Sequence, residues 1–197
     1  MTMNVEQYVM AYHVEQDRLR AMLPEGFTSL RPVLRINGEI REKNGKETVY
    51  LEFNTPVAFE DKRGWRNIAR WESPKDPFSY ERNGKSVTFR SPFLTITFTG
   101  VGLTGGCPAE RDNDGCFYPD EGFVPAERID SGREFCDCEF AWHFHEGDAY
   151  GKSIGKTLPA FLTDAEKNYP KLPLTAENAA AIPCDQVLGS YVVKFTR

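Results

Sequence analysis

Four potential metal ligands lie close together in the second half of the chain. Cys136 and Cys138 are followed by His143 and His145, and thiolates and imidazoles are side chains that zinc prefers. On one extended strand, however, side chains alternate between two faces, so the cysteines point to one face and the histidines to the other. The polar face, with Glu139, His143 and His145, is the sterically easier metal site. A metal-dependent enzyme that uses these three residues is therefore one hypothesis.

A cysteine can also act as a nucleophile if an imidazole lies beside its thiol. The same alternation opposes such a pair within residues 136–145. His13 is distant in sequence and could approach any of the five cysteines, so a Cys–His pair with His13 stays an open alternative.

A second candidate site is a row of charged residues on a strand expected at residues 30–41. Residues of opposite character alternate along it, which gives one apolar and one polar face. The apolar face holds Leu30, Leu34, Ile36 and Ile40, and the polar face holds Arg31, Arg35, Asn37, Glu39 and Arg41. If the sheet closes around a cavity, the polar face forms an anion-binding wall. Otherwise it is a solvated surface, and periodicity alone does not decide between the two.

The elements that must position these residues are short β-rich runs separated by glycine, proline and acidic residues. Besides 30–41, strands are predicted at 5–14, 47–55, 65–71, 86–90, 93–101, 134–145 and 186–196. Helices are predicted at 15–23 and 158–168, and a long loop at 102–132. Many antiparallel strands with two small helices predict a single domain, residues 1–197, of the α+β class, built as a barrel or curved sheet.

The charge balance excludes some classes of function. The 197 residues include 24 basic and 29 acidic side chains, a net charge of −5, which argues against nucleic-acid binding. The apolar runs are too short to span a bilayer, so we expect no membrane association. The polar N-terminal residues lack the apolar core of a signal peptide, and five cysteines are an odd number. Reduced thiols in the cytoplasm are the expected state.

The first third of the chain resembles the N-terminal region of acetoacetate decarboxylases. The residues that carry the resemblance are Tyr12, then Leu19-Arg20, then Leu23-Pro24-Glu25, and then Pro32-x2-Arg35. It continues through Val49-Tyr50-Leu51-Glu52 and Pro56-Val57-Ala58-Phe59 as far as Gly64. The resemblance implies an antiparallel, cone-shaped β-barrel with small flanking helices and an interior pocket for a small keto acid.

The resemblance also implies roles for individual residues. Glu52 falls where the family has a pocket glutamate, and Asn37 falls at the position of a second one. The family's chemistry uses a lysine in a Pro-Lys-Lys run, which forms an imine with a ketone; this run is absent here. Counting from Gly64 puts the lysine pair at Phe89-Arg90, so Arg90 is expected to pair with a ligand carboxylate.

Two lysines near that position are candidates for imine formation. Lys85 is the first and Lys75 the second, because the negative charge of Asp76 would raise the pKa of Lys75 and keep its amine protonated.

These observations predict an acetoacetate decarboxylase-like protein that binds a small keto acid or carboxylate inside a barrel. Lys85, Glu52 and Lys75 are the candidate catalytic residues, and Arg90, Asn37 and Arg35 the candidate substrate-binding residues. No cofactor is expected, and the family's oligomers make a homo-oligomer plausible. Two alternatives stay open: a non-enzymatic carrier or sensor that uses the same barrel, and the metal-dependent enzyme described above.

Overall fold

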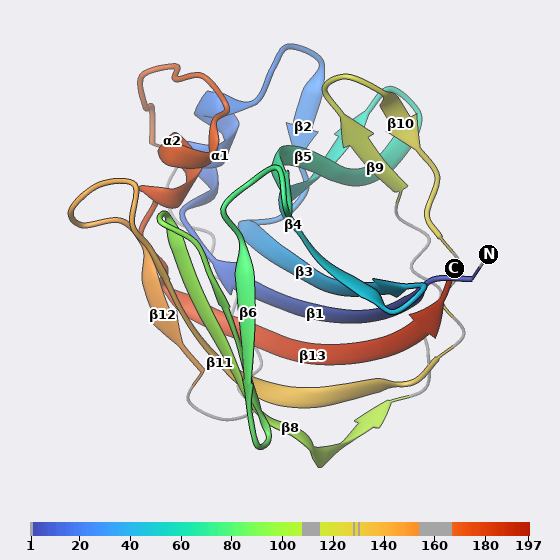
Figure 1. Ribbon diagram of the computed structural model, residues 1–197. Helices are drawn as coiled ribbons and strands as arrows, with labels where there is room; N and C mark the ends of the chain where they lie inside the picture. The colour runs from blue at the N-terminus through green and yellow to red at the C-terminus, as the bar shows by residue number, and fades with distance from the viewer. Residues whose placement is uncertain (1, 108–114, 128, 130, 154–166) are drawn as a thin grey trace.

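The protein folds around one large, curved sheet that is almost entirely antiparallel (Figure 1). The computed structural model describes residues 2–107, with backbone alone for 102–107, and residues 115–127, 129, 131–153 and 167–197. The strands are β1 (Asn4–His13), β2 (Phe27–Ser29), β3 (Val33–Lys43), β4 (Lys46–Phe59), β5 (Lys62–Glu72), β6 (Ser79–Asn83), β7 (Ser86–Arg90), β8 (Leu94–Cys107), β9 (Gly115–Tyr118), β10 (Gly122–Val124), β11 (Arg133–Trp142), β12 (Tyr150–Lys152) and β13 (Gln186–Thr196). The helices are α1 (Gln16–Met22) and α2 (Ala176–Ala180).

The order of the strands shows how the sheet is built. Hydrogen-bonded neighbours run β10-β9-β5-β4-β3-β1-β13-β11-β8-β7-β6, with β2 on β4 and β12 on β11. Figure 1 shows β3, β1, β13 and β11 side by side, with β6 crossing in front of them. The mostly antiparallel architecture with small helices confirms the predicted class. The order has two ends, β10 and β6, so the expectation of a closed, cone-shaped barrel is not confirmed.

The main core lies between the long strands and the part of the sheet that folds back over them. Tyr8 on β1 packs against Phe89 on β7 and Phe98 on β8, with ring centroids 5.4 and 5.3 Å apart. Phe89 also lies against Gly38 on β3, where an added Cβ would come within 3.3 Å of the ring. Each buried ring contributes about 1.5–3 kcal/mol to stability, so this aromatic layer holds the folded-back strands in place.

The alternation predicted for 30–41 is confirmed on β3, and β4 has the same pattern. Leu34, Ile36 and Ile40 are buried in the main core, as are Leu51 and Phe53 on β4. Their polar neighbours therefore point to the other face of the sheet.

The predicted loop at 102–132 is wrong in part, because β8 continues to Cys107 and the stretch also contains β9 and β10. The short strands escape detection because glycine, proline and acidic residues surround them. The strand expected at 134–145 ends at Trp142. Most of the helix expected at 158–168 lies outside the described residues. Within the described part of the chain, neither helix is long and apolar enough to cross a membrane.

Candidate functional site

The polar face of the sheet forms one wall of a cavity of about 320 Å³. Its lining side chains come from seven strands: Gln7 and Val9 on β1, Arg35, Asn37, Glu39 and Arg41 on β3, Tyr50 and Glu52 on β4, Arg70 on β5, Cys116 and Tyr118 on β9, Val124 on β10, and Tyr191 on β13. Arg197 and several residues of 121–129 complete the lining. Four of the five residues predicted on the polar face of 30–41 thus line a cavity, whereas Arg31 is exposed outside it; anion binding at this wall stays a prediction.

The centre of the cavity wall is a row of residues set by strand register. Val9, Asn37, Glu52 and Arg70 lie opposite one another across β1, β3, β4 and β5. Side chains directly opposite in antiparallel strands are separated by only about 5 Å at Cβ, so Asn37 and Glu52 lie side by side.

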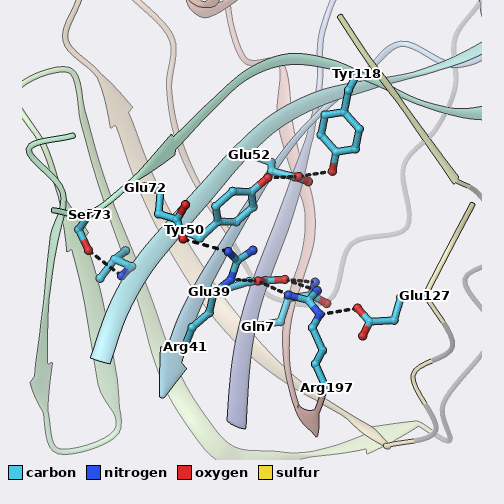
Figure 2. A network of polar contacts seen from close by, with 11 residues as sticks. Gln7, Glu39, Arg41, Tyr50, Glu52, Glu72, Ser73, Tyr118, Glu127 and Arg197 are labelled. Atoms are coloured by element: carbon cyan, nitrogen blue, oxygen red, sulfur yellow. Dashed lines mark hydrogen bonds and ion pairs between the residues drawn. The ribbon is translucent and has the colours of Figure 1, made fainter. Parts of the chain in front are cut away.

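Glu52 is buried and accepts three hydrogen bonds from neutral groups. Figure 2 shows its carboxylate between Tyr50, whose hydroxyl donates over 2.5 Å, and Tyr118, whose hydroxyl also donates to it. Asn54 donates from its side-chain amide over 3.2 Å, and the Asn67 side-chain amide in turn donates to the Asn54 Oδ1 over 2.9 Å. The site therefore fixes the orientation of this carboxylate from two sides.

The tyrosines on Glu52 are held in their protonated form. Burial, together with the negative charge of Glu52, raises the pKa of both Tyr50 and Tyr118 far above the usual tyrosine value. Both hydroxyls are therefore hydrogen-bond donors at neutral pH.

Glu39 forms a second buried centre in the same cavity. Arg41 donates to its carboxylate over 2.7 Å, Arg197 makes a two-pronged contact over 2.9 and 3.0 Å, and Gln7 donates over 3.1 Å (Figure 2). Burial alone would raise the pKa of Glu39, but the two guanidinium charges outweigh burial and hold it below the usual value. Glu39 is thus an ionised anchor for two arginines.

The remaining cationic side chains of the cavity are positioned by aromatic rings. The Arg35 guanidinium lies 3.6 Å from the centroid of Trp65, and that of Arg70 lies 4.9 Å from Tyr118. Arg70 also forms ion pairs with Asp120 and Glu121 over 2.6 and 2.8 Å. These contacts fix the guanidinium planes at the cavity wall.

Strand β9 reaches the cavity because it lies unusually close to β5. The two strands pair in parallel, with Gly64 opposite Gly115 and Trp65 opposite Cys116. A Cβ on Gly64 would lie 2.4 Å from the Gly115 carbonyl oxygen, so only glycine fits there. This contact brings Cys116 and Tyr118 into the cavity wall.

Cys116 is not a reactive thiolate. Burial and the negative charge of Glu52 raise its pKa to about 12, which keeps the thiol protonated at neutral pH. His13, the imidazole considered above for a Cys–His pair, bonds Asp185 through Nδ1 over 2.9 Å.

Comparison with solved structures identifies the fold. An acetoacetate decarboxylase from Legionella pneumophila superposes with a TM-score of 0.63 at 12% identity, over 99% of this chain and 83% of that one. The chain has the acetoacetate decarboxylase fold. The enduracididine biosynthesis enzyme MppR, solved with the condensation product of pyruvate and imidazole 4-carboxaldehyde, superposes with a TM-score of 0.59 at 9% identity, over 99% of this chain and 85% of that one. No family model and no curated protein matches the sequence.

The acetoacetate decarboxylase fold thus extends the resemblance from the first third to nearly the whole chain. Among the sequence-predicted site residues, the structure brings Glu52, Asn37 and Arg35 together in the cavity. Lys75, Lys85 and Arg90 are exposed and do not line it: Lys75 lies between β5 and β6, Lys85 in the turn between β6 and β7, and Arg90 at the end of β7.

The alternative metal site is not assembled. Glu139 accepts a hydrogen bond from Tyr150 over 2.9 Å, whereas His143 contacts Thr95 over 3.3 Å and His145 lies 3.9 Å from Asp148. Among the described residues, no three histidine, cysteine or acidic side chains are grouped to hold a metal ion. The reason is that β11 ends at Trp142, so the histidines do not continue the strand face of Glu139.

Several cavity residues carry no role in the sequence-based prediction. Tyr50 stands two residues from Glu52 on one strand, and this spacing is a signal that could have identified it. Tyr118, Arg70 and Arg197 are far from it in sequence, and only the tertiary fold brings them to the cavity.

Replacing Tyr118 by Phe is expected to lower the free energy of unfolding by about 1.5 kcal/mol, because it removes a hydrogen bond to a buried charged acceptor. Urea denaturation measures the change. Tyr150→Phe is the matched control, since exposed Tyr150 also donates to a glutamate, and it should change stability by less than about 0.5 kcal/mol. Equal effects of the two substitutions would contradict a structural role for the Tyr118–Glu52 contact.

Proposed function

We propose that the cavity binds a small organic acid, either a keto acid or another small carboxylate. The observation that carries this proposal is the arginine-rich polar wall, in which Arg35 lies two residues from Asn37 and faces the same cavity. A guanidinium held in place by an aromatic ring is well suited to bidentate binding of a carboxylate. The fold neighbour MppR, solved in complex with pyruvate, supports the same class of ligand.

We further propose that binding in this cavity proceeds without an imine. No lysine lines the cavity among the described residues, and the guanidinium groups present there stay protonated and do not add to a carbonyl. Proton transfer, if the bound acid reacts, falls to Glu52 and to the hydroxyls of Tyr50 and Tyr118. A carrier or sensor role is favoured by the same absence of a cavity lysine.

The test is isothermal titration of the full chain with pyruvate, acetoacetate and 2-oxobutanoate. Arg35→Gln should weaken binding by about 10- to 100-fold, since a charge-assisted hydrogen bond contributes about 1.5–3 kcal/mol. Arg90→Gln is the control and should leave the affinity unchanged, because Arg90 is exposed outside the cavity. A loss of binding in Arg90→Gln, with Arg35→Gln unaffected, would overturn the assignment.

Borohydride treatment with the same acids separates the chemistries. We expect no increase in intact mass, because no described lysine reaches the cavity. A stable adduct on Lys85 or Lys75 would restore imine chemistry at a different place on the molecule. Recovery of a bound acid unchanged from purified protein favours a carrier, whereas its turnover favours an enzyme.

A further inference from the structure

Glu52 is a buried carboxylate without an ion-pair partner among the described residues; Arg70, opposite it on β5, pairs with Asp120 and Glu121 instead. It is 6% exposed, and its partners are the two tyrosine hydroxyls and the Asn54 amide, all neutral. Among the described residues, no arginine or lysine forms an ion pair with it. Glu39, buried to a similar degree in the same cavity, has two arginine partners. Buried carboxylates are normally paired with a cation, so the charge at Glu52 calls for one.

Asn37, directly opposite Glu52, adds an acceptor that has no donor. Its side-chain oxygen is buried and has no hydrogen-bond partner among the described residues, and the residue is 7% exposed. Buried amide oxygens are almost always satisfied, so a group that enters the cavity is expected to donate to this one. Tyr50 and Tyr118 use their hydrogens on Glu52, which leaves only oxygen lone pairs toward the cavity.

The cavity wall therefore has two chemically different parts. Arg35 provides a cation that suits a carboxylate, while Asn37 and Glu52 provide an acceptor and an anion. Arg35 and Asn37 lie on the same face of β3, about 7 Å apart along the strand. This spacing lets one small molecule contact both parts.

We propose that the ligand is a small amino acid, with its carboxylate at Arg35 and an ammonium group at Glu52 and Asn37. The inference rests on the proposed function, since it refines the class of acid that the cavity binds. A hydroxyl group would satisfy the Asn37 oxygen but leave the charge of Glu52 unbalanced. An ammonium group does both, and it donates three hydrogen bonds. An unsubstituted acid does neither.

The test compares acids that differ only in this group. Titrations with 4-aminobutanoate, 4-hydroxybutanoate and butanoate, and with alanine, lactate and propanoate, cover two positions of the substituent. In at least one series, the amino acid should bind about 10- to 100-fold more tightly than the unsubstituted acid. Glu52→Gln, which keeps the volume and removes the charge, should abolish this advantage, so that the amino acid and the unsubstituted acid then bind with similar affinity.

Two variants and the wild-type series keep the test decisive. Glu47→Gln is the matched control, because Glu47 also accepts a hydrogen bond from a tyrosine, Tyr80, but lies outside the cavity. If Glu52→Gln does not fold, Asn37→Ala should reduce the same advantage. Unsubstituted or hydroxy acids that bind wild type as tightly as the amino acids would overturn this inference alone. If no acid of either series or of the keto-acid panel binds, the proposed function fails as well.

Discussion

Glu39→Gln is expected to lower the free energy of unfolding by about 3 kcal/mol, the lower end of the range for removal of one partner from a buried ion pair. The carboxylate is 2% exposed and forms ion pairs with both Arg41 and Arg197. Without it, two guanidinium groups that contact the same buried carboxylate lose that shared partner. The lower end applies because both arginines keep some access to solvent. Urea denaturation at neutral pH measures the loss.

Glu72→Gln is the matched control for this substitution. Glu72 also pairs with Arg41, over 3.3 Å, but it is exposed, so its loss should cost less than about 1 kcal/mol. Similar losses for the two variants would show that the Glu39 centre adds nothing beyond an ordinary surface pair.

The stabilisation by Glu39 should also depend on pH. Because its pKa is lower in the folded than in the unfolded chain, its contribution is fully present above the unfolded value of about 4.3 and is lost as the pH falls through the folded value. The stability difference between wild type and Glu39→Gln should therefore shrink in acid. A difference that grew below pH 4 would contradict the lowered pKa.

Gly64→Ala is expected to cost about 3 kcal/mol, the upper end of the range for overpacking a tight site. The added methyl group would meet the backbone of Gly115 at 2.4 Å, and no side-chain rotation relieves such a clash. Strand β9 must then move away from β5, and it carries Tyr118 with it. We therefore expect weaker binding of small acids along with the lost stability, measured by titration and urea denaturation.

Gly189→Ala on β13 is the control, because nothing lies within 4 Å of an added Cβ there. It should be neutral or slightly stabilising, since alanine restricts the unfolded chain more than glycine does. If Gly64→Ala were as stable as Gly189→Ala, the close approach of β5 and β9 would be wrong.

Local pattern in the sequence predicts much of the fold but only part of the site. Alternation along β3 and β4 correctly separates core residues such as Ile36 and Leu51 from Asn37 and Glu52. The family resemblance adds the expectation that this polar face lines a ligand pocket. Both signals are local, and they reach only the two strands at the centre of the cavity wall.

The remaining site residues depend on contacts between distant segments. Tyr118 lies on a four-residue strand whose composition resembles a loop, and its pairing depends on the fit of Gly64 against Gly115. Counting along the chain from Gly64 points to Arg90, but Arg90 is exposed at the end of β7. Spacing in sequence does not determine the direction in which a folded-back strand presents its side chains. Arg197 is 158 residues away in sequence from Glu39, to which it donates.

The stacking of Arg35 on Trp65 supplies the protein with its own optical probe. Two of its three tryptophans, Trp71 and Trp142, pack into the main core, on the face of the sheet away from the cavity. Of the three, only Trp65 packs against the guanidinium of Arg35, which we propose binds the ligand carboxylate. A carboxylate bound to Arg35 offsets its positive charge and so changes the electric field at a single indole ring. Intrinsic fluorescence can therefore follow occupancy of the cavity without any label.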